Sequence, residues 1–165
     1  MKKQPNSHHC IICGVRNQGG VHVHYYETVS AEGTPEVLAR FTGRHHHQGY
    51  PNRMHGGIIT GILDETIGRA INIGVGDSVP QTWGVTVELD VKFHRPVPLD
   101  VELTARGRIT NLSTRLFAGT GELYLPDGTI AASCVGKFVQ LTLDQIGPSE
   151  ADALGWQVYP DEQPA

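Results

Sequence analysis

The sequence predicts an α+β domain in which one helix lies on an antiparallel sheet. Two strand-like segments come first, a single stretch with helical periodicity follows them, and the rest of the chain alternates between apolar and polar residues. The chain has 165 residues, and a domain takes roughly 150. A second large domain therefore has no room in this chain.

The first half of the chain supplies two strands and the helix. Residues 21–26 and 37–41 are strand-like and are separated by a turn, and a polar, histidine-rich loop follows over residues 43–54. A helix is predicted from residue 55 to about residue 73, where glycines and a proline end the pattern. Its apolar residues recur at helical spacing: Ile59, Ile62, Leu63, Ile67, Ala70 and Ile71.

The second half reads as sheet. Between residues 85 and 93 every odd residue is apolar and every even one polar, which is the period of a half-buried strand. Further strands are predicted over residues 101–109, 116–125 and 130–143, across turns rich in glycine, asparagine and proline. Four consecutive strands of this kind favour an antiparallel arrangement.

The chain divides into three parts. Residues 1–19 form an N-terminal turn segment with a CxxC pattern, residues 20–144 form the main domain, and residues 145–165 form a tail that we expect to be loosely ordered because of its prolines.

The cysteine and histidine clusters invite a metal interpretation. Cys10 and Cys13 could supply half of a zinc site with His8 or His9 completing it, or a redox pair, but a second CxxC is missing and the surrounding glycines favour a tight turn. In the histidine run at 45–47, adjacent side chains seldom converge on one ion. We therefore expect no metal and no cofactor.

Composition limits the partners. Thirteen Lys and Arg against 17 Asp and Glu give a net charge of -4, which does not suit a nucleic-acid partner. The apolar runs are too short to span a bilayer. Lys2 and Lys3 are followed by polar residues rather than by the apolar stretch of a secretory signal. The sequence predicts a cytoplasmic protein with reduced cysteines and no membrane partner.

The predicted helix carries a second face of small residues. Gly57, Thr60, Gly61, Asp64 and Gly68 fall within about 100° of one another, opposite the apolar set. Each glycine inside a helix costs roughly 1 kcal/mol relative to alanine. Something therefore approaches this backbone closely, and the candidates are another helix, a second copy of the chain, or a ligand.

Asp64 lies in the middle of this face. Glu65 and Arg69 are four residues apart and can pair structurally, whereas the residue four after Asp64 is Gly68. A solvated carboxylate of no chemical importance is one interpretation. A carboxylate packed between close helices would instead be partly desolvated, with a raised pKa.

The start of the helix offers a candidate oxyanion hole. Amides in a first helical turn lack intrahelical acceptors and lie at the positive end of the helix dipole. The sequence His55-Gly56-Gly57 would let a carbonyl approach them, although it could also be an unusual helix cap. Gly57 and Asp64 are seven residues, or about 10 Å, apart along the axis. Both can act on one carbonyl only if two copies pack antiparallel, so a dimer would complete two sites.

The segment from residue 47 to residue 65, HQGYPNRMHGGIITGILDE, resembles the signature of hotdog-fold acyl-CoA thioesterases of the phenylacetic-acid-degradation type. The stretch over residues 10–20, CIICGVRNQGG, resembles an opening found in a branch of the same superfamily. Together with the strand order, the resemblance covers most of residues 10–143.

This resemblance implies a long central helix wrapped by an antiparallel sheet, in a homodimer with sheets joined edge to edge and often in a homotetramer. It also implies hydrolysis of an acyl-CoA or related acyl thioester without a metal. The family carboxylate lies nine residues after the motif histidine, which here is Asp64. The amide of Gly56 would bind the oxyanion, with Gly57 the second choice, and His55 would orient the loop.

The remaining candidates concern substrate binding. Asn52, Gln48 and His47 could orient water, and Thr60 and Gly61 belong to the face that the substrate would meet. The phosphates of CoA could contact four basic residues that could equally be solvated charges: Arg106, Arg108, Arg115 and Lys137.

Three functions compete at this point. In a thioesterase, Asp64 acts either as general base or as nucleophile, and the sequence does not choose. A hydratase or dehydratase of acyl thioesters would need a histidine such as His47 beside the carboxylate. A protein that only binds acyl-CoA would gain nothing from a carboxylate beside the thioester carbonyl.

Overall fold

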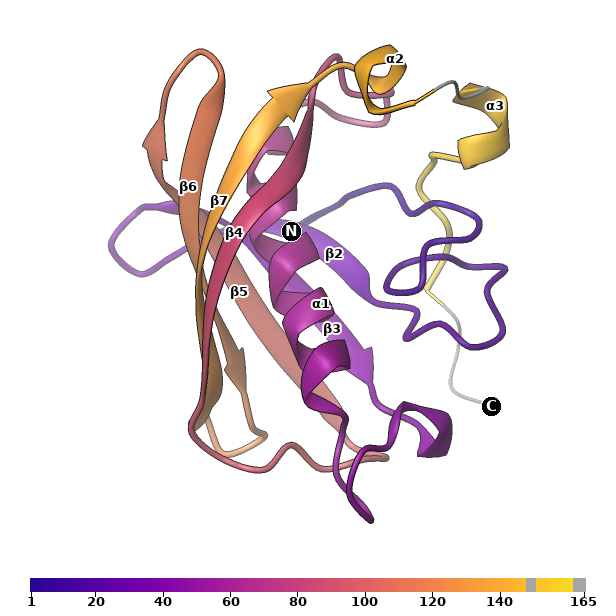
Figure 1. The fold of residues 1–165 in the computed structure, drawn as a ribbon, viewed down its shortest axis with the longest axis vertical. Helices are drawn as coiled ribbons and strands as arrows, with labels where there is room; N and C mark the ends of the chain where they lie inside the picture. Colours follow the sequence, from indigo (N-terminus) through magenta and orange to yellow (C-terminus); the bar gives the residue numbers. More distant parts are fainter. Residues whose placement is uncertain (148–150, 162–165) are drawn as a thin grey trace.

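The computed structural model describes residues 1–147 and 151–161, in which an antiparallel sheet curls around one long helix (Figure 1). The strands are β1 (Lys2–Lys3), β2 (His24–Val29), β3 (Pro35–Thr42), β4 (Trp83–Phe93), β5 (Glu102–Leu112), β6 (Leu116–Tyr124) and β7 (Ile130–Leu141). The helices are α1 (Gly56–Gly68), α2 (Leu143–Ile146) and α3 (Ala151–Leu154), with the 3-10 turns η1 (His45–His47) and η2 (Arg69–Asn72). The predicted fold class is confirmed.

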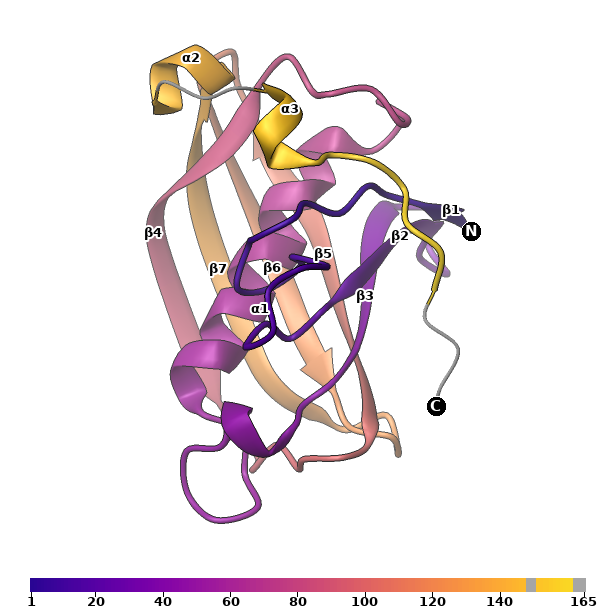
Figure 2. The ribbon, with the colours of Figure 1, turned by 90° about the vertical axis from the view of Figure 1, so that its right-hand side faces the viewer.

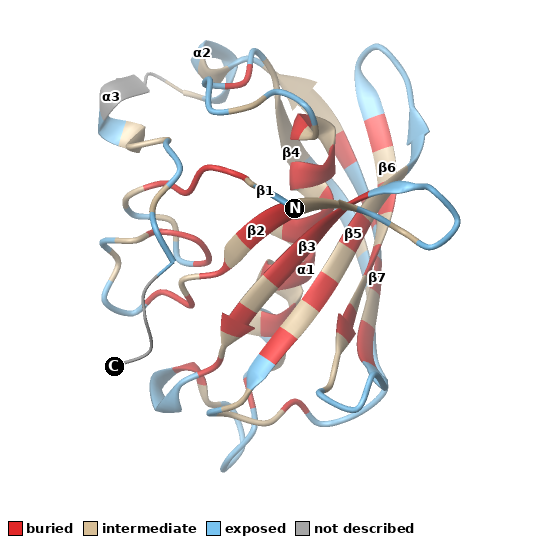
Figure 3. Cartoon of the chain, turned by 180° about the vertical axis from the view of Figure 1, so that it is seen from behind, coloured by how far each residue is buried: buried red, intermediate tan, exposed pale blue. Residues whose placement is uncertain are grey.

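The sheet order is β1-β2-β3-β5-β6-β7-β4, with every neighbouring pair antiparallel. Seen from behind the sheet, buried and partly buried residues alternate along β5 and β6 (Figure 3). This alternation exists because one face packs on α1 and the other is turned outward.

Helix α1 continues directly into η2, so the helical stretch ends within a residue or two of the predicted boundary. Its predicted apolar face is buried against the sheet: Ile59, Ile62, Leu63 and Ile67 are all less than 5% exposed. Burying four such side chains stabilises the fold by roughly 1.5–3 kcal/mol each before entropic costs.

Glycines in β5 and β6 let the helix approach the sheet closely. A Cβ at Gly107 would lie 2.6 Å from the carbonyl oxygen of Thr66, and a Cβ at Gly119 or Gly121 would collide with the side chain of Ile67. The sequence predicted a close contact on the face of α1 that carries small residues. The opposite face of α1, which packs on the sheet, makes a close contact as well.

Strand β4 departs from the predicted alternation. A bulge between Thr86 and Glu88 shifts its register against β7. Val87, the extra residue of the bulge, is 63% exposed; Phe93, at the strand end, is 54% exposed. The expectation of a regular half-buried strand over residues 85–93 is wrong at this bulge. Within the described residues β4 pairs only with β7, so its other edge is open.

The two ends of the chain lie side by side across α1 (Figure 2). The amide of Asn6 donates to the carbonyl of Gln157 at 2.9 Å, and the amide of His8 donates to that of Leu154 at 2.9 Å. Tyr26 also donates to Asp161 at 2.7 Å. Contrary to the expectation of a loosely ordered tail, the described residues 154–161 pack on the rest of the fold. The other part of that expectation, at residues 148–150 and 162–165, lies outside the described residues.

The N-terminal segment contains the predicted tight turn. The amide of Gly14 donates to the carbonyl of Cys10 at 2.8 Å. A Cβ at Gly14 would lie 2.4 Å from that same oxygen, so only glycine fits. None of the helices in the described ranges is long and apolar enough to cross a membrane.

We expect Gly107→Ala to lower the free energy of unfolding by about 1–3 kcal/mol, because the added methyl meets helix backbone, which cannot move aside as a side chain could. Gly147→Ala is the matched control, since a Cβ there meets nothing within 4 Å, and its effect should stay within about 0.5 kcal/mol. Urea denaturation monitored by circular dichroism measures both. If both substitutions lowered the free energy of unfolding equally, the close contact between Gly107 and α1 would not contribute to stability.

Candidate functional site

A cavity of about 680 Å³ lies along the small-residue face of α1. Its walls come from α1 and η2, from β4 and β7, from the N-terminal turn and from the segment after α3. The lining includes residues on or beside α1, namely His55, Gly57, Gly61, Asp64, Glu65 and Gly68, and residues around the helix, namely Cys10, Ile12, Trp83, Thr86, Phe138 and Trp156. Its lining is mostly apolar, apart from a few charged or hydrogen-bonding groups.

Asp64 is one of two partly buried carboxylates that line this cavity; the other is Glu65. Thr86 Oγ1 donates to Asp64 Oδ1 at 2.7 Å, while Oδ2 has no hydrogen-bond partner among the described residues. Burial raises the pKa of Asp64, and the hydrogen bond from Thr86 opposes that shift only in part. Sequence reasoning missed Thr86, because a regular alternation gave no reason to turn this side chain toward the helix.

The helix start presents one open amide. His55 is the N-cap, and its Nδ1 accepts from the amide of Gly57 at 2.9 Å. The amide of Gly56 has no acceptor among the described residues. Of the two glycine amides suggested by the sequence, only that of Gly56 is therefore free to bind another oxygen. Gly56 itself is not part of the cavity wall and lies near Phe93.

The loop before the helix is held by internal hydrogen bonds. His47 is 1% exposed; its Nδ1 accepts from the amide of Arg44 at 2.9 Å and its Nε2 donates to the carbonyl of Gly19 at 3.2 Å. Gln48 Oε1 accepts from the amide of Asn52 at 3.0 Å. Asn52 has a φ of 60°, a left-handed conformation that asparagine tolerates.

The structure thus brings together only part of the predicted site. His55, Gly57, Gly61 and Asp64 line the cavity, whereas His47, Gln48 and Asn52 do not. Thr60 Oγ1 donates to the carbonyl of Gly56 at 2.9 Å and also stays outside the cavity wall.

The N-terminal turn covers the small face of α1. Ile12 Cδ1 would lie 3.0 Å from a Cβ built on Gly61. One partner of the small-residue face is therefore this chain's own N-terminus, an option the sequence did not suggest. The available signal was the apolar pair Ile11 and Ile12 inside a polar stretch.

The predicted pair of Glu65 and Arg69 forms, but it is buried. Arg69 Nε donates to Glu65 Oε1 at 2.9 Å, and Arg69 Nη1 donates to the carbonyl of Pro5 at 2.7 Å. The guanidinium stacks over the rings of Tyr25 and Trp156, 4.1 and 4.8 Å from their centroids. Burial raises the pKa of Glu65 to about 7, although Arg69 opposes the shift. Arg69 therefore joins both ends of the chain to α1.

Three of the four basic candidates for CoA phosphates are already ion-paired. Arg106 and Arg108 both contact Glu36, which is 2% exposed, and Arg108 also contacts Glu122. Lys137 contacts Glu88. Arg115 is exposed and forms no ion pair within the described residues.

Comparison with known proteins shows which family this chain resembles. Residues 52–132 match the thioesterase superfamily. An uncharacterised protein of Schizosaccharomyces pombe is 33% identical over 96 residues, which cover 56% of this chain and 53% of that protein. The match thus spans about half the length of the curated relative.

Solved structures share the fold. A thioesterase superfamily protein is 28% identical over 79% of this chain and 63% of that one, with a TM-score of 0.66. A Bacillus halodurans protein solved with CoA is 25% identical over 62% and 70%, with a TM-score of 0.55. A phenylacetic acid degradation-related protein of Ralstonia eutropha is 18% identical over 73% and 86%, with a TM-score of 0.60, and shows the fold alone. The resemblance to hotdog-fold thioesterases is confirmed.

We expect Asp64→Asn to stabilise the fold at neutral pH. Because the pKa of Asp64 is higher in the folded than in the unfolded chain, ionisation disfavours folding, and this cost grows as pH rises through the folded pKa. The isosteric amide removes the charge and keeps an acceptor for Thr86. Melting temperatures of both proteins between pH 3.5 and 7.5 should converge at the acid end and diverge above it. A variant less stable at neutral pH would contradict the desolvation of Asp64.

Proposed function

Because the chain carries a thioesterase superfamily domain with the hotdog fold, we propose that it hydrolyses acyl-CoA thioesters at Asp64. The observation that carries the proposal is the partly desolvated carboxylate in an apolar cavity, on the helix whose first amide is open. The CoA in the Bacillus halodurans structure supports CoA as the leaving group. A cytoplasmic location remains a prediction from the sequence.

Asp64 is suited to activating water or to attacking the carbonyl itself. A raised pKa makes the carboxylate a stronger base. Because Thr86 donates to Oδ1, the lone pairs of Oδ2 stay available to accept a proton or to attack the acyl carbon. In the general-base route, Asp64 takes a proton from water as the oxygen bonds to the acyl carbon. The carbon–sulfur bond then breaks, and the proton on Asp64 can pass to the departing sulfur.

The amide of Gly56 supplies the oxyanion donor in this proposal. A backbone N–H aimed at the developing negative charge contributes about 3–4 kcal/mol to transition-state stability. The helix dipole adds to it at this end of α1. His55 holds the amide of Gly57 and so fixes the first turn in place.

One chain does not complete this arrangement. Gly56 and Asp64 are separated by eight residues, or about 12 Å along the axis, so in this proposal a second copy supplies one of them. The open edge of β4 and the exposed Val87 and Phe93 support edge-to-edge pairing of two sheets. We propose a homodimer in which Asp64 of one chain faces Gly56 of the other, and dimers of such dimers remain compatible with it.

A hydratase finds less support. The candidate His47 is buried with both ring nitrogens bonded. His55 reaches the cavity, but its Nδ1 already accepts a hydrogen bond, so its neutral ring carries the proton on Nε2 and offers a donor rather than a base.

Thiol release from a panel of acyl-CoAs tests the reaction. We expect wild-type turnover and a fall in kcat of about 10²–10⁴ for Asp64→Asn, since a general base contributes that much. Asp77→Asn is the control, because Asp77 is an exposed carboxylate in the turn after η2, outside the cavity and away from β4. Binding of acyl-CoA without thiol release would favour a binding protein, and double-bond hydration without thiol would favour a hydratase.

Gly56→Pro tests the oxyanion donor. Proline removes the amide hydrogen yet is favoured at the first helical position, and the extended conformation of His55 (φ -65°, ψ 134°) suits a residue before proline. We expect kcat to fall by about 10²–10³. Gly56→Ala keeps the amide and adds a Cβ 3.5 Å from Phe93, so it should retain most activity. Equal losses in the two variants would remove the amide from the mechanism.

Mixing the Asp64→Asn and Gly56→Pro chains tests the shared site. A mixed dimer holds one intact pair, so random exchange of equal amounts should restore about a quarter of wild-type activity. No recovery, with exchange shown by mass spectrometry, would place the whole site within one chain.

A further inference from the structure

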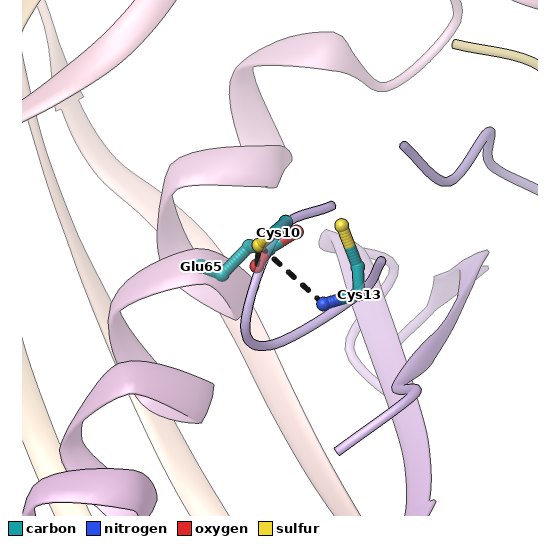
Figure 4. Close-up of side chains that lie close together, drawn as sticks. All are labelled: Cys10, Cys13 and Glu65. Atoms are coloured by element: carbon teal, nitrogen blue, oxygen red, sulfur yellow. Dashed lines mark hydrogen bonds between the residues drawn. The ribbon is translucent and has the colours of Figure 1, made fainter. Parts of the chain in front are cut away.

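The CxxC turn meets a carboxylate of α1 that the proposed hydrolysis does not use. Cys10, Cys13 and Glu65 each present one ligand atom, and these atoms all lie within 4.8 Å of one another. Figure 4 shows the two cysteines on the N-terminal turn, with Glu65 reaching the sulfur of Cys10 from the helix. The sulfur of Cys10 lies 3.3 Å from Glu65 Oε2. His8 and His9, the ligands that the sequence suggested, are not part of this group.

We propose that Cys10, Cys13 and Glu65 form a zinc site that fastens the N-terminal turn to α1. Zinc binds thiolate sulfur at about 2.3 Å and carboxylate oxygen at about 2.0–2.2 Å in tetrahedral sites. Two ligands at those distances are separated by roughly 3.5 Å, close to the spacing of Cys10 and Glu65. Cys10 and Glu65 also line the cavity, so a water molecule there can be the fourth ligand.

Backbone amides around the sulfur of Cys10 suit a thiolate. The amides of Ile12 and Cys13 donate to this sulfur at 3.3 and 3.5 Å, and they stabilise negative charge on it. The hydroxyl of Ser7 lies 3.5 Å from the sulfur of Cys13. The turn that aims these amides depends on Gly14, where no side chain fits.

The local charges balance when zinc is bound. Two thiolates and one carboxylate carry three negative charges, which Zn²⁺ and the buried guanidinium of Arg69 neutralise together. Arg69 holds Oε1 of Glu65 and leaves Oε2 to the metal, as an outer hydrogen bond orients a metal ligand. Binding releases the two thiol protons to solvent.

Metal content of the full chain tests the proposal. After chelation under reducing conditions and dialysis against Zn²⁺, elemental analysis should give about one zinc per wild-type chain. Cobalt(II) in place of zinc should give tetrahedral d–d bands and thiolate-to-cobalt charge transfer. The metal should also raise the melting temperature, because it binds only the folded turn.

Variants assign the ligands. Cys10→Ser should lose the zinc and Glu65→Gln should bind it at least about 10-fold more weakly. Cys134→Ser is the control, because this third cysteine is buried on β7 and does not belong to the cluster. If Cys10→Ser does not fold, the cobalt spectrum of the wild type decides. Zinc retained in Cys10→Ser, cobalt bands without thiolate charge transfer, or a metal-free chain with a Cys10–Cys13 disulfide would each overturn the proposal.

Discussion

The close contact of α1 with the glycines of β5 and β6 fixes how the helix lies on the sheet, and the position of the cavity depends on it. Gly107 lies against the backbone at Thr66, while Gly119 and Gly121 accommodate Ile67. This contact fixes the rotation of α1 about its own axis. Because side-chain positions repeat every 3.6 residues along a helix, the same rotation also fixes which residues lie on the opposite side. The small residues and Asp64 therefore face away from the sheet, where β4 and the chain ends enclose a cavity.

The burial of Asp64 lowers the stability of the fold when the carboxylate is ionised, and the same burial makes the carboxylate a stronger base for the proposed reaction. Its surroundings withdraw water from the carboxylate and offer a hydroxyl, Thr86, in place of a cation. An arginine at that position would stabilise the charge and lower its basicity. The next residue, Glu65, has such a partner in Arg69, which opposes the effect of its burial only in part. Adjacent carboxylates on one helix therefore have different environments and different proposed roles.

The chain ends form a third layer over the helix, and Arg69 connects it. This one guanidinium contacts Glu65 on α1, the carbonyl of Pro5 and the ring of Trp156. A cation in contact with two aromatic faces and two oxygens is well compensated for its burial. The layer closes the cavity on one side and places the CxxC turn beside Glu65.

The sequence by itself determined where the helix and most strands lie and which carboxylate stands on the small-residue face of the helix. Periodicity located the helix and six of the seven strands of the described sheet, because repeats of 3.6 and 2 residues record which face is buried. The same helical geometry placed Asp64 among the glycines. Tertiary structure alone decided which groups meet Asp64, Gly61 and Glu65, because Thr86, Ile12 and Cys10 reach them across 22 to 55 residues of chain. No local pattern encodes such contacts; they follow from a bulge in β4 and from the path of the N-terminus over α1.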